Sequence, residues 1–155
     1  MKHELGRSLI EMVGVLAIGG ILTAGAFRTF EVVQSRQNRA IAEDQLRDIA
    51  TNAKILFSGR KSFDNISAGY LIKAGAMKSD RVRLGGEMVV VSLPPSKDAP
   101  KSFEILIPEL GNSDCLYFAT KKLDFVGRIL VNGYEQTPAS YCQTGPTNAI
   151  SFIIK

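Results

Sequence analysis

The sequence predicts an α+β protein in which one very long N-terminal helix packs its second half against a small antiparallel sheet. Two observations predict this fold class. Apolar residues recur at mostly three- and four-residue spacings from Phe30 to Leu56, with no proline or glycine between Phe27 and Ser58. Beyond that point, short runs of β-branched and aromatic residues alternate with turn residues. With 155 residues and 45% apolar content, the chain can bury one domain core rather than two.

The first part of this helix has the length and composition of a membrane span. From residue 8 to residue 27 the only charged side chain is Glu11, and twenty helical residues extend about 30 Å, the thickness of a hydrocarbon core. A secretory signal peptide is one interpretation, because Ala24-Gly25-Ala26 has the form of a cleavage site. The helical pattern continues through that point, however. An ordinary membrane anchor is a second interpretation.

Glu11 favours a third interpretation. An ionisable residue inside a membrane span costs about 2.5 to 3.5 kcal/mol on insertion scales, so its carboxylate requires a counter-charge. A simple anchor gains nothing from such an acid. The free α-amine of a processed chain could supply the positive charge.

The residues around Glu11 resemble a known processing signal. Gly6, followed by Arg7-Ser8-Leu9-Ile10-Glu11 and an apolar run, is similar to the class III signal of type IV pilins. The resemblance implies that a prepilin peptidase cuts after Gly6 on the cytoplasmic face and methylates the new N-terminus at Arg7. It also implies the pilin fold, divided into a leader (1–6), a long helix (7–57) and a head (58–155). Arg7 departs from the Phe, Met or Leu usual at this position.

The same resemblance assigns an assembly role to the apolar helix. Glu11 of one subunit would meet the α-ammonium group of its neighbour, so that only the correct register pairs both charges. Four glycines would permit close helix contact or local unwinding, which is frequent in this part of pilin filaments. They are Gly14, Gly19, Gly20 and Gly25.

The remainder of the chain predicts a mixed head. We expect a turn-rich segment at 58–64, a short helix at 68–76, and a helix capped by Ser113 that contains Cys115. A turn is expected at Asn132-Gly133. Four strands are expected, at 87–93, 103–107, 128–131 and 150–154.

The two cysteines, Cys115 and Cys142, fit neither a Cys-x-x-Cys redox motif nor a metal knuckle. They favour a single structural disulfide over two buried free thiols, because the N-terminus places the head in an oxidising compartment. The head also resembles the type IVb branch of the pilins. The similarity lies in LIKAGAMKSDRVRLGGEMVVVSL, FEILIPELGNSDCLYFAT and YCQTGPTNAISFIIK.

Composition argues against catalysis and against cofactors. The only histidine is His3, so the body of the protein offers no imidazole for a triad or a zinc site. Gly85-Gly86 predicts a turn, since no phosphate-binding motif surrounds it. We expect no metal site and no enzymatic activity.

The distribution of charges predicts neither a nucleic-acid partner nor a metal site. The net charge of +4 includes no long run of like charges, so nucleic acid is not expected as a partner. Glu43, Asp44 and Asp48 cluster on the long helix, but Arg39 and Arg47 lie among them. A solvated helix face is therefore favoured over a metal site.

The leading hypothesis is a structural subunit of a type IVb-like pilus. It would be held in the bacterial inner membrane as a precursor and would become extracellular after polymerisation. Its partners would be other copies of itself, inner-membrane lipid, the prepilin peptidase and the assembly platform. Alternatives are a minor pilin, a periplasmic pseudopilin of type II secretion, and an anchored binding protein that does not assemble. Major pseudopilins usually bind calcium through an acidic C-terminal loop, whereas only Asp124 and Glu135 are acidic after residue 123.

Overall fold

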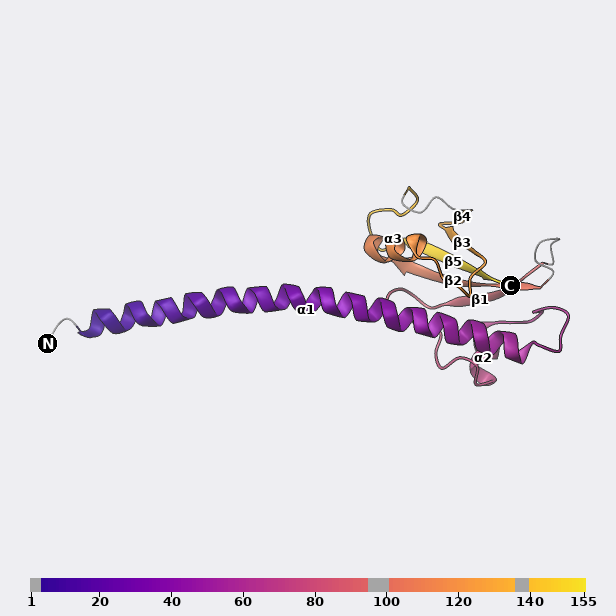
Figure 1. Ribbon diagram of the computed structural model, residues 1–155, viewed down its shortest axis with the longest axis horizontal. Coiled ribbons are helices and arrows are strands. Elements are labelled where there is room, and N and C mark those ends of the chain that lie inside the picture. Colours follow the sequence, from indigo (N-terminus) through magenta and orange to yellow (C-terminus); the bar gives the residue numbers. More distant parts are fainter. Residues whose placement is uncertain (1–3, 95–100, 136–139) are drawn as a thin grey trace. The chain divides into compact units, whose positions relative to one another are not determined.

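A computed structural model describes residues 4–94, 101–135 and 140–155, without the side chains of residues 5–8 and of Glu4 and Arg28. The chain forms two compact units, Met1–Asn38 and Arg39–Lys155. The elements, labelled in Figure 1, are α1 (Glu4–Leu56), α2 (Ala68–Lys73), β1 (Val89–Leu93), β2 (Ser102–Leu110), α3 (Asn112–Thr120), β3 (Arg128–Val131), β4 (Tyr134–Glu135) and β5 (Asn148–Ile154).

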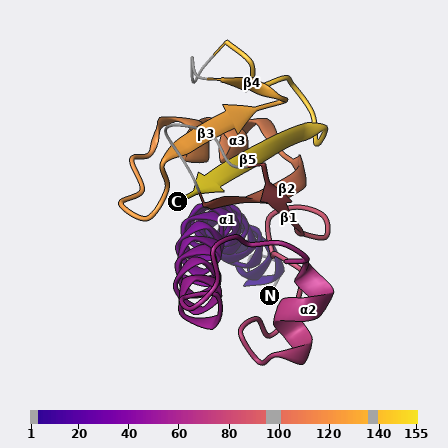
Figure 2. The ribbon, with the colours of Figure 1, turned by 90° about the vertical axis from the view of Figure 1, so that its right-hand side faces the viewer.

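The second unit contains one antiparallel sheet with the strand order β1-β2-β5-β3-β4. Figure 2 shows the C-terminal strand β5 between β2 and β3. The α+β prediction is confirmed, with all four expected strands present. β2 is longer than expected because it continues past an irregularity between Ile107 and Leu110, where Glu109 adopts a φ of 59°. A bulge of this kind lets a strand bend without ending.

One face of the sheet and one face of α1 form the core. Phe103, Ile105 and Ile107 alternate along β2 and pair with Ile154, Phe152 and Ile150 of β5, and all six side chains are fully buried. The second half of α1 contributes residues at three- and four-residue spacings, which is the pattern of a helix with one apolar face. These are Ala42, Leu46, Ile49, Ala50 and Ala53, and Phe57 joins the core directly after the helix end.

α3 joins the same core and corrects one prediction. The ring of Phe118 lies edge-on to Phe152, with centroids 5.7 Å apart. Ser113 is not the N-cap, because α3 begins at Asn112, and Gly111, two residues before Ser113, occupies the cap without a side-chain hydrogen bond. The expected start was wrong because the extended backbone of Gly111 follows directly from β2.

Two other element boundaries differ from the sequence predictions. α2 ends at Lys73 instead of residue 76, because Gly75 adopts a φ of 73° and the amide of Ala76 turns back to the Leu71 carbonyl. β1 begins at Val89 instead of residue 87. Glu87 forms only an isolated bridge with Arg81.

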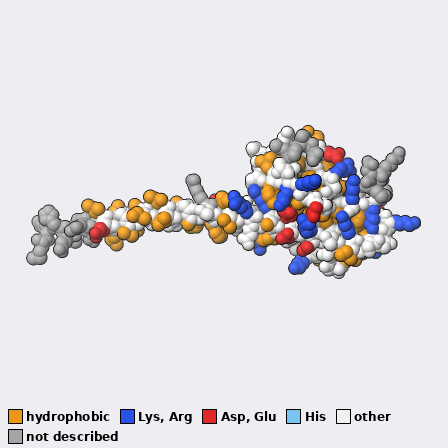
Figure 3. Space-filling view, in the orientation of Figure 1, with side chains coloured by type: hydrophobic (Ala, Val, Ile, Leu, Met, Phe, Trp, Pro, Cys, Tyr) orange, Lys and Arg blue, Asp and Glu red, His pale blue; other side chains and the backbone are white. Residues whose placement is uncertain are grey.

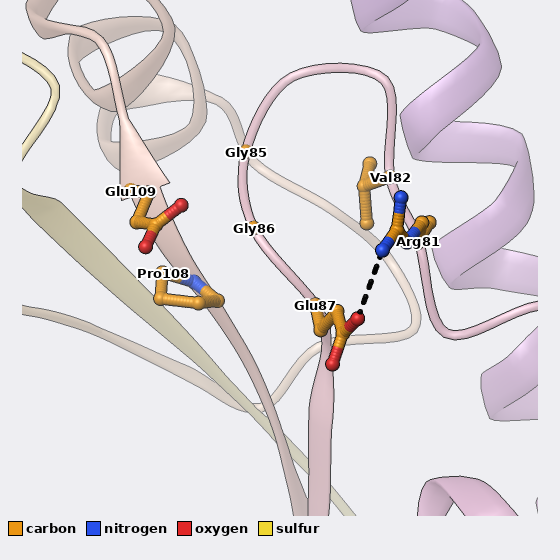
Figure 4. Close-up of a pocket in the computed structure, with 7 residues that line it drawn as sticks. All are labelled: Arg81, Val82, Gly85, Gly86, Glu87, Pro108 and Glu109. Carbon is orange, nitrogen blue, oxygen red and sulfur yellow. Dashed lines mark hydrogen bonds and ion pairs between the residues drawn. The ribbon is translucent and has the colours of Figure 1, made fainter.

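The predicted turn at Gly85-Gly86 lies where two backbone segments approach closely. Figure 4 shows both glycines beside Pro108 and Glu109. These residues line a pocket of ≈ 620 Å³. The Gly86 amide donates to the Pro108 carbonyl at 2.9 Å. A Cβ atom on Gly85 would lie 2.4 Å from the same oxygen.

Gly85→Ala is therefore expected to destabilise the head by about 2 to 4 kcal/mol, because backbone rather than a movable side chain blocks the methyl group. The measurement is urea unfolding followed by circular dichroism. Gly69→Ala is the matched control. Gly69 lies in α2 with open space around a Cβ, so its replacement should stabilise by about 0.5 to 1 kcal/mol. Equal effects of the two variants would contradict the close approach at Gly85.

Candidate functional site: an exposed apolar helix

The first unit is a helical segment whose side chains are apolar and exposed. Its large hydrophobic residues are between 52 and 76% exposed, and Figure 3 shows them along this part of α1. Such a surface requires cover from lipid or from other helices. The exposed residues are Leu9, Ile10, Met12, Val13, Val15, Leu16, Ile18, Ile21, Leu22, Phe27, Phe30, Val32 and Val33.

In length and composition α1 can cross a bilayer. Within the described residues it is the one helix that satisfies both criteria, with a window of mean hydropathy 1.9 in Leu9–Leu56 and none of that window buried inside the structure. A core helix of a soluble protein would be mostly covered instead. The prediction of a transmembrane helix therefore agrees with the lack of cover around this segment.

Glu11 is the one charged residue between residues 8 and 27 of this apolar surface. Its side chain is exposed and makes no hydrogen bond or ion pair with any side chain that the structure describes. Gly6 and Arg7 lie in the first turns of α1, and the Arg7 side chain is outside the described atoms. The counter-charge of Glu11 and the cleavage after Gly6 remain predictions.

The four glycines of the assembly segment make no packing contact with the part of the chain that the structure describes. Apart from the adjoining residues and the local backbone of the helix, no described atom lies within 4 Å of a Cβ built on Gly14, Gly19, Gly20 or Gly25. An isolated helix would be more stable with alanine at these positions, by about 1 kcal/mol each in water. A contact outside the chain, or a need for a weak helix, would explain glycine here.

Two threonines in this segment are satisfied by the glycine backbone. Thr23 Oγ1 donates to the Gly19 carbonyl at 2.7 Å, and Thr29 Oγ1 donates to the Gly25 carbonyl at 2.9 Å. A hydroxyl without a partner is costly in lipid, and these internal bonds remove that cost. The threonines were missed at the sequence level, although their Gly-x-x-x-Thr spacing could have identified them.

In the second unit, three ion pairs fasten α1 to α3 and to the loop that follows it. Arg39 Nε lies 2.7 Å from Asp114 Oδ1, and both side chains are less than one-fifth exposed. Lys121 Nζ lies 2.5 Å from Glu43 Oε2. In the third ion pair, Arg47 Nη1 lies 2.9 Å from Asp124 Oδ2. The three α1 residues are spaced four apart, so they share one helix face.

These three ion pairs correct the prediction that the charged cluster on α1 is a solvated helix face. Glu43 is not a solvated carboxylate, because α3 brings Lys121 against it. Asp44 and Asp48 are exposed, as expected. Within the described residues, no group of three or more possible ligands could hold a metal ion.

Because of the Glu43–Lys121 ion pair, we expect the head to lose stability at alkaline pH. The hydrogen bond to Glu43, and next that to the Tyr117 hydroxyl, raise the pKa of Lys121 above its ordinary 10.5. A lysine whose pKa is higher in the folded than in the unfolded state contributes its full stabilisation at pH values below its unfolded-state pKa. This stabilisation is lost as the pH rises through its folded-state pKa. The melting temperature should therefore fall less steeply above about pH 10.5 in Lys121→Met than in the wild type.

Lys122→Met is the control for this titration. Lys122 is exposed and has no hydrogen bond or ion pair with the described residues. Its removal should leave the alkaline slope of the melting temperature unchanged. An identical slope in the wild type and both variants would show that Lys121 contributes nothing there.

The disulfide between Cys115 and Cys142 closes the C-terminal region. The two residues are 27 apart in sequence, with Cα atoms 5.8 Å apart. The expected pairing is thus confirmed. By chain-entropy arithmetic such a loop contributes about 3.5 kcal/mol to stability.

Three asparagines also hold the loop at Cys142. Asn112 Nδ2 donates to the Cys142 and Gln143 carbonyls, and Asn132 Nδ2 donates to the Tyr141 carbonyl at 2.7 Å. Asn148 is fully buried and anchors the network. Its amide donates to the carbonyls of Leu110, Gln143 and Gly145, while its oxygen accepts from Asn132 Nδ2 and the Gln143 amide.

Comparison with known proteins relates this architecture to solved pilins. No protein-family model and no curated protein matches the sequence. The fold resembles TcpA, a type IV pilin from the El Tor biotype of Vibrio cholerae, with a TM-score of 0.61 and 15% identity over 77% of this chain and 99% of that one. It also resembles a type IVb pilin from Salmonella typhi, with a TM-score of 0.55 and 20% identity over 73% and 97% of the two chains. The chain has the pilin fold.

Proposed function

We propose that the chain is a structural subunit of a type IVb-like pilus. One observation carries the proposal: an exposed apolar helical span, residues 8–27, in which Glu11 is the only acid, precedes a head with the pilin fold. The helix has no cover within the described residues, so its stable states are in a bilayer or among other copies of the same helix. Self-association is accordingly the central partner interaction.

The proposed pathway is the one that the resemblance of Gly6 to Glu11 to the type IV pilin signal implies. The precursor enters the inner membrane through residues 8–27, and the peptidase removes residues 1–6 and exposes the α-amine of Arg7. Each Glu11 then pairs with the amine of a neighbouring subunit as the assembly platform extracts the helix from lipid. The polymer leaves the cell with its disulfide-closed heads on the outside. The Cys115–Cys142 bond fits an oxidising destination.

Three alternative functions make different demands on the helix and on the C-terminal region. A pseudopilin of type II secretion would remain in a periplasmic pseudopilus and would usually require calcium in the C-terminal region. In the described part of that region, a disulfide and an asparagine network hold the loop. A minor pilin would share the helix and differ in abundance. An anchored binding protein would have no use for Glu11 in an apolar segment.

Intact-mass measurement of the protein from its native envelope tests this proposal. The expected mass lacks residues 1–6, carries one methyl group on the new N-terminus, and is two hydrogens lighter for the disulfide. An intact N-terminus in the assembled or membrane-bound protein would contradict it. A mass that begins at Phe27 would instead support a cleaved signal peptide.

A further inference from the structure

The hairpin between β3 and β4 contains a chemically labile dipeptide. Of all the asparagines in the chain, only Asn132 is followed by glycine. Both residues have positive φ, 51° and 83°, so the predicted turn at Asn132-Gly133 is confirmed, as a tight two-residue hairpin. Glycine has no side chain to shield its own amide nitrogen, and this nitrogen can therefore attack the asparagine side chain that precedes it.

The reaction of such a dipeptide is deamidation, and water is its only co-reactant. The Gly133 nitrogen loses its proton to hydroxide and forms a bond with Cγ of Asn132. The bond from Cγ to Nδ2 breaks, and ammonia leaves after taking a proton from water. A second water molecule then opens the cyclic imide at either of its carbonyls, which yields aspartate or isoaspartate. Attack requires that Cγ of Asn132 turn towards the Gly133 nitrogen.

In the folded head, the Asn132 side chain is held by other contacts. Its Nδ2 donates to the Tyr141 carbonyl at 2.7 Å and to Asn148 Oδ1 at 3.2 Å. Its Oδ1 accepts from the Ala149 amide of β5 at 2.8 Å. The backbone is fixed as well, because the Asn132 amide donates to the Ala149 carbonyl at 2.8 Å. Rotation of Cγ towards Gly133 would break the side-chain bonds.

The Tyr141 carbonyl depends on the disulfide for its position. The next residue, Cys142, is bonded to Cys115 of α3. The Tyr141 ring also stacks on Tyr134, with ring centroids 4.9 Å apart and planes 11° apart. The disulfide and the ring contact therefore keep this acceptor within reach of Asn132.

Deamidation would reverse the hydrogen bonding at this position. An ionised aspartate has no side-chain donor, so its carboxylate would face the Tyr141 carbonyl and Asn148 Oδ1, which now accept hydrogen bonds from Asn132. An isoaspartate would add a carbon atom to the backbone of the hairpin and disturb the pairing of β3 with β4. Either product prevents the loop at Cys142 from restoring its original contacts.

We propose that Asn132-Gly133 is a deamidation site that the closed C-terminal loop protects. Reduction of the Cys115–Cys142 disulfide opens the loop and frees the Asn132 side chain for attack, and the reaction then makes the opening irreversible. The site converts a reversible redox change into a permanent chemical one. It involves only residues of the second unit and is independent of the proposed pilus function.

Peptide mapping by mass spectrometry tests this protection on the full chain in detergent at mildly alkaline pH. The rate of aspartate and isoaspartate formation at Asn132 is measured in oxidised protein, in protein kept reduced with dithiothreitol, and in chain unfolded by guanidinium. Because attack requires the open loop, the oxidised protein should react at least about tenfold more slowly than the reduced protein. Asn112, which precedes a serine, is the internal control and should react more slowly than Asn132 in the unfolded chain.

Three results would overturn the proposal. Equal rates in the oxidised and the unfolded samples would show that the fold gives no protection. Equal rates in the oxidised and the reduced samples would show that the disulfide does not control the site. A faster reaction in the oxidised protein than in the unfolded chain would show that the fold promotes deamidation instead. These measurements use the wild type, so they do not depend on the folding of any variant.

Asn132→Asp tests the consequence of the reaction. Dithiothreitol should reduce its Cys115–Cys142 disulfide about tenfold faster than that of the wild type, because the loop has lost the bonds from Asn132. Asn112→Asp is the matched control for the added charge, since Asn112 also donates to this loop but does not bond to Tyr141. A wild-type rate of reduction in Asn132→Asp would contradict the irreversible opening.

Discussion

Glu11→Ala is expected to abolish filament formation while leaving the protein in the membrane and its head folded. The alanine variant removes the carboxylate that pairs with a neighbour's α-amine, so an unpaired ammonium group remains inside the apolar bundle. A charge without a partner in such surroundings costs about 2.5 to 3.5 kcal/mol, or roughly a hundredfold in each association step. Electron microscopy of sheared filaments and immunoblotting of the membrane fraction measure the two outcomes.

Glu31→Ala is the matched control for this variant. Glu31 lies on the same helix, is exposed, and has no hydrogen bond or ion pair with the described residues, but it lies beyond the span of residues 8–27. Filament yield should be close to that of the wild type. Normal filaments from Glu11→Ala would remove the electrostatic basis of the proposed function and would favour an anchored protein that does not assemble.

Local periodicity explains why so much of the fold could be predicted. The apolar spacing of α1 and the β-branched runs of β1, β2, β3 and β5 each depend on residues close in sequence, so a pattern is visible without tertiary structure. β4 contains only two residues, too few to show alternation. The cap of α3 was misplaced because Gly111 has no side chain to signal its role.

The contacts that depend on distant residues could not be predicted. Glu43 and Lys121 are 78 positions apart, and only the packing of α3 against α1 makes them partners. Asn148 is a similar case, because a lone asparagine before a strand is usually part of a solvated turn. Tyr134 was also missed, since two separate tyrosines carry no sign that their rings will stack. Gly6, Arg7 and Glu11 of the N-terminal helix, by contrast, could be predicted because they form a motif of residues adjacent in sequence.

Asn148→Ala is expected to destabilise the head by about 4 kcal/mol, the largest effect we expect from one substitution in this unit. The side chain is fully buried, and its removal takes this partner from the carbonyls of Leu110 and Gly145 and from the amide of Gln143. The Gln143 carbonyl still accepts from Asn112, and Asn132 Nδ2 still donates to the Tyr141 carbonyl. Each buried polar group without a partner costs about 1 to 3 kcal/mol, partly recovered where water can enter. Guanidinium unfolding with the disulfide intact measures the loss.

Asn112→Ala is the control that shows whether the stability loss of Asn148→Ala exceeds that of removing another asparagine from the same network. Asn112 donates to two carbonyls of the same loop, but it lies partly exposed, so water can replace it at a cost of about 1 kcal/mol. Asn148→Asp sharpens the comparison, because a carboxylate would face the three carbonyl oxygens that now accept hydrogen bonds. Its stability should recover partly in acid, as protonation restores one donor. If Asn148→Ala and Asn112→Ala lost equal stability, the buried amide would not be the anchor of the loop.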